Sequence, residues 1–152
     1  MRAAVPDWVA EYVGIPFREF GRDRSGCDCW GLARLVWAER IGLAVPDAGT
    51  DYPGFHADLI GKALRDGREA GDWRVVAEGE ERPLDAVLMK GYVPGESGGY
   101  RAVELHVGVV VTPAWLLHVE RGIDTCLADY RRDRRLSRRV VGFWRHRELC
   151  GV

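Results

Sequence analysis

The chain lacks the features that mark membrane-spanning and secreted proteins. No apolar run approaches the ~20 residues that a membrane-spanning helix needs. The first segment, residues 1–15, contains Asp7 and Glu11 and has no long apolar core, which is unlike a signal peptide. We therefore expect synthesis in the cytoplasm without a signal peptide, with any later export following another route.

The chain also has few cysteines, few lysines and almost no net charge. The 152 residues include four cysteines, and nothing else in the composition indicates a disulfide-stapled scaffold. Cys27 and Cys29 are too close in sequence for an easy mutual bridge, so we interpret all four cysteines as thiols. Only Lys62 and Lys90 are lysines, and the net charge of -1 gives no overall attraction to nucleic acid or membrane surfaces.

The remaining composition is that of an ordinary globular protein. Hydrophobic residues make up 47% and charged residues 30% of the chain, which is long enough to bury a core. No internal repeat and no domain linker is visible. We therefore expect a single domain over residues 1–152.

Periodicity divides the chain into a helical part and a strand part. Apolar residues at helical spacing predict helices over residues 6–13, 29–42 and 55–68, with a loop over 14–26 and a linker over 46–53. Alternating residues then predict strands over 73–77, 86–89, 103–111, 115–119 and 140–144, with a flexible loop over 91–100. Helices followed by strands predict an α+β fold with a mostly antiparallel sheet.

The first candidate for chemistry is a cysteine at a predicted helix start. Asp28 is suited to cap the helix that begins at Cys29. The unpaired backbone N–H groups and the dipole of a helix N-terminus favour a thiolate, which is the reactive form of cysteine. Cys29 is therefore a candidate nucleophile.

Two histidines follow on neighbouring predicted strands. In the segment 103–111 the odd-numbered residues are all apolar and predict a core face, so His106 lies on the opposite face. A three-residue turn over 112–114 would pair Val111 with Trp115 and bring His118 diagonally beside His106, about 7 Å away at the backbone. We expect the two imidazoles to meet on one face of this hairpin.

These three residues form a set that can carry out acyl transfer. Cys29 would act as nucleophile, His106 as its base, and His118 as the group that orients His106. The backbone N–H of Cys29 is placed to stabilise an oxyanion. The set favours amide hydrolysis.

Five segments resemble a known family when they are taken in order. They are Tyr12–Phe17, Asp28–Leu32, Pro83–Leu88, Leu105–Val109 and Leu117–Val119. Together they are similar to the motifs of NlpC-family cell-wall cysteine peptidases. The resemblance implies a compact papain-like fold, no metal, and cleavage of amide bonds in peptidoglycan stem peptides.

The run from Gly14 to Arg22 is similar to small tail-associated peptidases of phages and gene transfer agents. That resemblance implies a place in a phage-like tail among tail-tip or baseplate proteins, and action on the cell wall during entry. Within the site we expect Tyr12, Asp28 and Trp30 to contact substrate. Trp30 replaces the serine that usually follows the nucleophile, so substrate choice is least predictable there.

Three other interpretations stay open at this point. The chain could be a structural tail-tip component that keeps the fold with little activity, or a papain-like amidase or acyltransferase with another substrate. Cys27, Cys29, His106 and His118 are legitimate zinc ligands, although a Cys–Cys spacing of two is short for a common structural site. The run Arg131–Arg139 is either a solvated segment or a contact for an anionic surface or an acidic neighbour.

Overall fold

The structure is a computed structural model that describes residues 4–45, 71–94 and 96–149. The predicted linker over 46–53 and the predicted helix over 55–68 lie outside the described residues. Within those ranges, the helices are too short or too polar to cross a membrane.

The N-terminal part of the chain forms a helical turn, a small hairpin and one long helix. These elements are η1 (Asp7–Glu11), β1 (Arg22–Asp23), β2 (Gly26–Cys27) and α1 (Cys29–Ile41). The helix predicted over 6–13 is only a 3-10 turn, because Pro6 and Gly14 (φ +94°) leave too few residues between them for an α-helix to propagate. Strand β1 lies inside the predicted loop over 14–26 and β2 begins at its last residue; strands of two residues give no alternation to detect.

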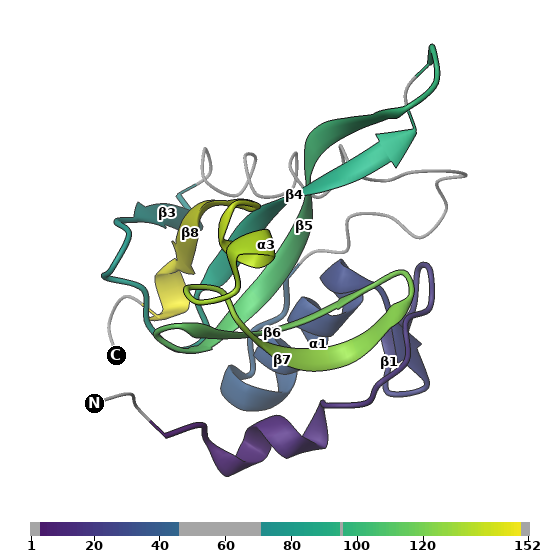
Figure 1. The fold of residues 1–152 in the computed structure, drawn as a ribbon. Helices are drawn as coiled ribbons and strands as arrows, with labels where there is room; N and C mark the ends of the chain where they lie inside the picture. The colour runs from purple at the N-terminus through teal and green to yellow at the C-terminus, as the bar shows by residue number, and fades with distance from the viewer. Residues whose placement is uncertain (1–3, 46–70, 95, 150–152) are drawn as a thin grey trace.

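The described residues from Trp73 onward build one antiparallel sheet with the strand order β3-β8-β4-β5-β6-β7 (Figure 1). Its strands are β3 (Trp73–Val76), β4 (Ala86–Pro94), β5 (Tyr100–Thr112), β6 (Trp115–Glu120), β7 (Ile123–Asp129) and β8 (Val140–His146). A short helix, α3 (Arg134–Ser137), joins β7 to β8, and a 3-10 turn, η2 (Arg147–Leu149), follows β8. Each predicted strand is present.

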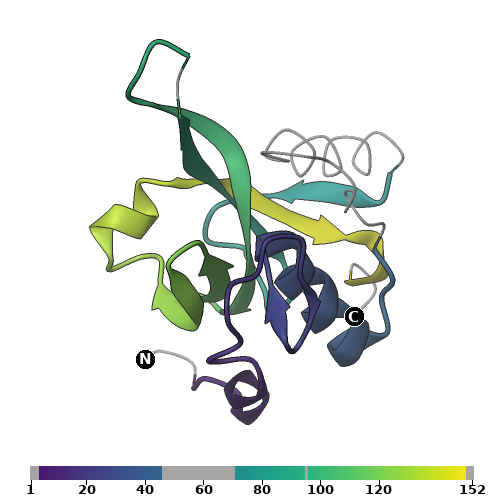
Figure 2. The same cartoon turned by 90° about the vertical axis from the view of Figure 1, so that its right-hand side faces the viewer.

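Two features of the sheet differ from the sequence-based expectation. Strand β7 was not predicted, because its burial alternates only weakly along the strand. The loop predicted over 91–100 is too long, since β4 continues to Pro94 and β5 begins at Tyr100. The far end of this hairpin projects away from the sheet and α1 (Figures 1 and 2).

Core residues pack on both faces of the sheet. On β4, Ala86 and Leu88 belong to the core that includes α1, whereas Val87 and Met89 belong to a second core that includes Leu136 of α3. Figure 2 shows α1 beside β1 and against the sheet. The side-chain alternation of the strands therefore places one helix on each face.

The segment Pro83–Leu88 has a structural explanation as well. Asp85 is fully buried and accepts hydrogen bonds from Nε and Nη2 of Arg145 at 2.8 Å and 2.7 Å. Such a two-pronged buried pair fixes β8 against the start of β4. The observed architecture confirms the predicted α+β class, with helix α1 packed on a mostly antiparallel sheet.

Candidate active site

Cys29 is the first residue of α1, as predicted. The side chain of Asp28 caps the helix by accepting the N–H of Gly31 at 2.8 Å, and it also accepts the N–H of Phe20 at 3.1 Å. Asp28 also forms an ion pair with Arg22, in which Oδ1 lies 2.7 Å from Nη1 of the guanidinium. Because Asp28 ties the β1–β2 region to the first helical turn, the position of Cys29 is fixed from both sides.

Glycines permit this close approach. A Cβ atom at Gly31 would overlap the backbone carbonyl oxygen of Gly21. The segment before β1 therefore lies directly on the first turn of α1, and a larger residue at either position would displace it.

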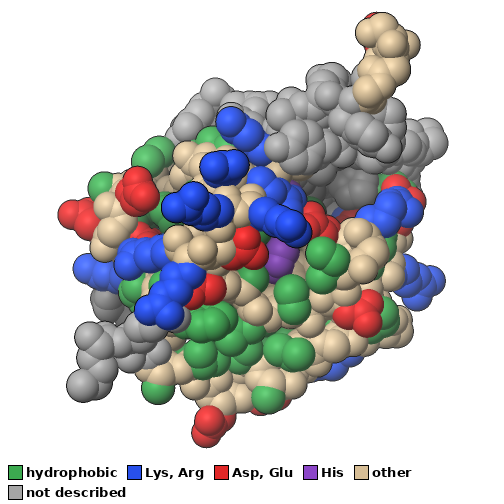
Figure 3. Space-filling view, in the orientation of Figure 1, with side chains coloured by type: hydrophobic (Ala, Val, Ile, Leu, Met, Phe, Trp, Pro, Cys, Tyr) green, Lys and Arg blue, Asp and Glu red, His purple; other side chains and the backbone are tan. Residues whose placement is uncertain are grey.

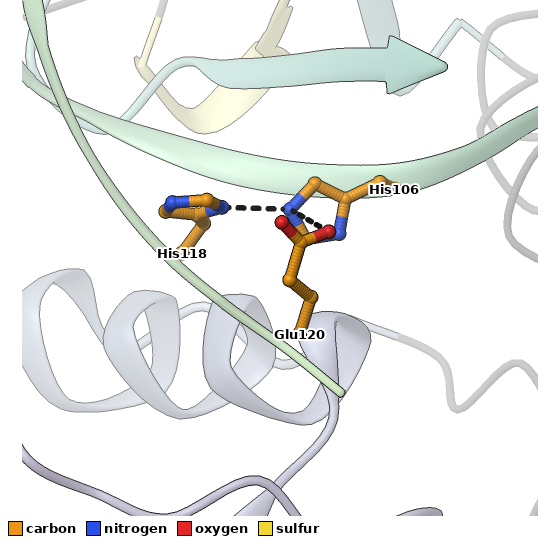
Figure 4. Close-up of side chains that lie close together, drawn as sticks. All are labelled: His106, His118 and Glu120. Carbon is orange, nitrogen blue, oxygen red and sulfur yellow. Dashed lines mark hydrogen bonds and ion pairs between the residues drawn. The ribbon is translucent and has the colours of Figure 1, made fainter. Parts of the chain in front are cut away.

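His106 and His118 meet on one face of the β5–β6 hairpin, as predicted. Nε2 of His106 lies 2.9 Å from Nδ1 of His118, and their exposed fractions are only 3% and 4% (Figure 4). The pairing of Val109 with Leu117 is the register that sets His118 opposite Gly108.

The tip of this hairpin differs from the prediction. Trp115 pairs with Thr112 rather than with Val111, and the register shifts between Val110 and Thr112. The turn is therefore two residues long, with Ala114 at φ +89°. The irregularity at Val111 absorbs the difference, so the register near the histidines is unchanged.

The thiol of Cys29 lies against the strand that carries His106. The backbone N–H groups of Val107 and Trp30 hydrogen-bond to it, and Val107 directly follows His106. The negative charge of Glu120 acts on both Cys29 and His106. Cys29 and the histidines therefore share one electrostatic environment.

Burial controls the charge state of both groups. It raises the pKa of Cys29 to about 12, because its effect is larger than the lowering of the pKa by the hydrogen bonds from the two backbone N–H groups. It also lowers the pKa of His106 to about 3 and lowers the pKa of His118. Burial therefore opposes the thiolate that we expect at this helix start and favours the uncharged thiol and imidazoles.

Glu120 is a member of this cluster that the sequence interpretation missed. Its Oε2 lies 3.9 Å from Nε2 of His106, and its two carboxylate oxygens accept hydrogen bonds from Nη1 and Nη2 of Arg139 at 2.9 Å and 2.8 Å. The available signal was a lone acidic residue at the end of an apolar strand. Its partner lies 19 residues later, in a run that the sequence leaves open between a solvated segment and a contact for an acidic group.

Within the described part of the chain, His106, His118 and Glu120 form a group that could hold a metal ion, since their ligand atoms all lie within 4.8 Å of one another. These atoms already have partners: the two histidines bond to each other, and Arg139 occupies Glu120. The thiol of Cys27 lies 3.0 Å from the carbonyl oxygen of Asp23 instead. The arrangement fits proton transfer better than metal binding.

The three residues expected to contact substrate are buried. Tyr12 is 0%, Trp30 1% and Asp28 3% exposed. The hydroxyl of Tyr12 donates to Glu39 at 2.8 Å, and the ring of Trp30 packs edge to face on Trp37. Each has a structural role here, and its contact with substrate stays a prediction.

The arginine run surrounds α3. Arg131 pairs with the buried Glu81 at 2.6 Å, and Arg139 turns inward to Glu120. The other four are exposed and form no ion pair with another described residue; they are Arg132, Arg134, Arg135 and Arg138. Figure 3 shows Lys and Arg side chains gathered on this face, with a histidine at their edge.

Comparison with known proteins supplies the fold family. No protein-family model and no curated protein matches the chain. A Staphylococcus aureus protein described as similar to a lipoprotein of the NLP/P60 family matches with a TM-score of 0.60 and 17% identity, over 92% of this chain and 39% of that chain. The NlpC/p60 domain of the peptidoglycan hydrolase SagA matches with a TM-score of 0.47 and 20% identity, over 80% of this chain and 82% of that chain.

The chain spans about two fifths of the length of the Staphylococcus aureus protein. At this identity the likeness concerns the fold and not the activity. The match shows that the chain has the papain-like fold of NLP/P60 family proteins, with Cys29 at the N-terminus of α1.

Proposed function

We propose that the protein is a cysteine peptidase that hydrolyses amide bonds in the stem peptides of peptidoglycan. The observation that carries this proposal is that the N–H of Val107, the residue after His106, hydrogen-bonds to the thiol of Cys29, while His106 and His118 are bonded to each other at 2.9 Å. The NLP/P60-type fold and the ordered sequence motifs support peptidoglycan as the substrate.

The hydrogen bond to His118 assigns roles to the nitrogens of His106. Because Nε2 is engaged with His118, Nδ1 is the ring nitrogen left to take the thiol proton. The sulfur then attacks the amide carbon, and the N–H groups at the start of α1 stabilise the oxyanion. His106 returns its proton to the leaving amine, and water hydrolyses the resulting thioester with His106 again as base.

The uncharged resting state is compatible with this sequence of steps. With the pKa of Cys29 near 12 and that of His106 near 3, the proton leaves sulfur only as attack proceeds. His106 then acts as a general base rather than as half of a preformed ion pair.

The proposed setting is a phage-like tail that carries the enzyme to the cell wall during entry. The sequence similarity of Gly14 to Arg22 to tail-associated peptidases supports this setting. The four exposed arginines around α3 offer a face for an acidic tail-tip or baseplate protein. Mass spectrometry of purified phage-like particles should detect the protein at a fixed copy number, and its absence from particles would contradict the setting.

Digestion of purified peptidoglycan tests the activity. The wild-type protein, kept reduced, should release stem-peptide fragments with new amino termini, identified by mass spectrometry. If the protein hydrolyses a simple thioester but releases no stem-peptide fragments from peptidoglycan, peptidoglycan is not its substrate. The proposed thiol chemistry would still be supported. Absence of both reactions would favour a structural component that retains the fold.

A further inference from the structure

Glu120 lies beside the histidine pair without belonging to the proposed triad. Its Oε2 is 3.9 Å from Nε2 of His106, the nitrogen that also contacts His118 (Figure 4). This distance is too long for a hydrogen bond but short enough for a strong charge interaction in a partly buried site. Its side chain is 25% exposed, whereas that of His106 is 3% exposed.

Arg139 holds Glu120 in this place. Two of its nitrogens bond the two carboxylate oxygens, and Nε donates to the backbone carbonyl of Lys90 at 2.9 Å. Burial raises the pKa of Glu120, but the hydrogen bonds from Arg139 and the neighbouring histidines lower it to about 2. Glu120 is therefore a fixed negative charge at neutral pH.

Titratable and charged groups lie around the pair on several neighbouring elements. They are Asp28 and Cys29 at the start of α1, His118 on β6, Cys126 on β7, and Arg139 before β8. Among them, Glu120 favours a positive charge on His106, whereas His118 and Arg139 oppose it. Glu120 is thus the group that offsets part of the burial penalty on a charged imidazole.

We infer that Glu120 is a positioning residue of this site, whose carboxylate, held by Arg139, stabilises the imidazolium that His106 becomes when it takes the Cys29 proton. The inference rests on the proposed function for its role in turnover. In this step the S–H bond breaks, an N–H bond forms at Nδ1 of His106, and Glu120 exchanges no proton. The carboxylate acts through its charge and Arg139 through placing it.

Removing the charge of Glu120 and removing the charge of Arg139 should shift the pKa of His106 in opposite directions. A purely structural role would not produce this pattern. In Glu120→Gln the charge of Arg139 acts alone on His106, so the pKa of His106 should fall. In Arg139→Gln the charge of Glu120 acts alone, so the pKa of His106 should rise by about one pH unit. Loss of packing or order would move both variants in the same direction.

NMR titration of histidine-labelled protein measures this without any substrate. We expect a His106 midpoint near 3 in the wild type, below that in Glu120→Gln, and above it in Arg139→Gln. Arg139→Lys keeps the positive charge and should stay near the wild type, and the exposed Glu96→Gln serves as the control. If Glu120→Gln does not fold, Arg139→Gln alone decides: a midpoint equal to or below that of the wild type overturns the inference.

Activity supplies a separate readout. If peptidoglycan is cleaved, Glu120→Gln should lower kcat about tenfold with KM unchanged, because the inferred role acts through the charge of His106 and not through substrate binding. Equal kcat in Glu120→Gln and the wild type would overturn the role in turnover. If the titrations behave as expected but the protein cleaves no peptidoglycan, the proposed function is refuted. The electrostatic role of Glu120 is then still supported.

Discussion

His106 and His118 meet edge to face, with ring centres 5.1 Å apart and Nε2 of one lying 2.9 Å from Nδ1 of the other. This contact fixes the ring of His106 and commits its Nε2 to a partner. The proposed catalytic nitrogen is therefore determined by a neighbouring strand rather than by His106 itself.

Replacing His118 tests that orientation. His118→Ala should lower kcat by about 10² because the ring of His106 is no longer held, whereas His118→Asn should retain more activity because its amide can still bond to Nε2. Steady-state kinetics on a soluble stem peptide measures the difference. Equal activity of the alanine variant and the wild type would show that His118 has no orienting role.

The charge state of Cys29 predicts how the thiol reacts with an alkylating reagent. Because burial raises its pKa to about 12, alkylation by iodoacetamide should be slow at pH 7 and rise about tenfold per pH unit up to pH 10. Peptide mapping by mass spectrometry gives the rate at Cys29 alone. A fast rate that is constant from pH 5 to pH 8 would instead reveal a preformed thiolate–imidazolium pair.

Asp28 should contribute strongly to stability through its cap. Asp28→Ala removes the acceptor of two backbone N–H groups and leaves Arg22 without this partner, at a cost of about 2–4 kcal/mol in the free energy of unfolding. Asp133 caps α3 in an exposed position, so Asp133→Ala should cost about 0.5–1 kcal/mol. Urea unfolding of both variants measures the contrast, and equal losses would contradict the role given to Asp28.

Part of this site was predictable because its signals are local. The cap at Asp28 follows from residue type and position at a helix start, and the histidine pair follows from alternation along two strands joined by a short turn. Glu120 and Arg139 could not be paired in advance, because the partners lie on either side of β7 and α3. The hairpin of β1 and β2 was missed because its strands are too short for a pattern, although Gly21 and Gly31 make its packing possible.

Burial of an uncharged His106 predicts a loss of stability in acid. Its pKa is lowered from 6.5 to about 3 in the folded state, so unfolding takes up a proton between these pH values. The contribution of His106 is therefore fully present above pH 6.5 and is lost as the pH falls toward 3, by up to about 1.4 kcal/mol per pH unit. Urea unfolding from pH 7 to pH 4 should show a shallower decline in His106→Gln, and parallel declines would contradict the lowered pKa.

The most direct test of the account compares two neighbouring buried thiols. Cys29→Ala should abolish the release of stem peptides from purified peptidoglycan, whereas Cys27→Ala, whose thiol contacts the carbonyl oxygen of Asp23, should retain it. Mass spectrometry of the released fragments, with unfolding curves to confirm that both variants fold, gives the answer. Undiminished release by folded Cys29→Ala would contradict the assignment of Cys29 as the nucleophile.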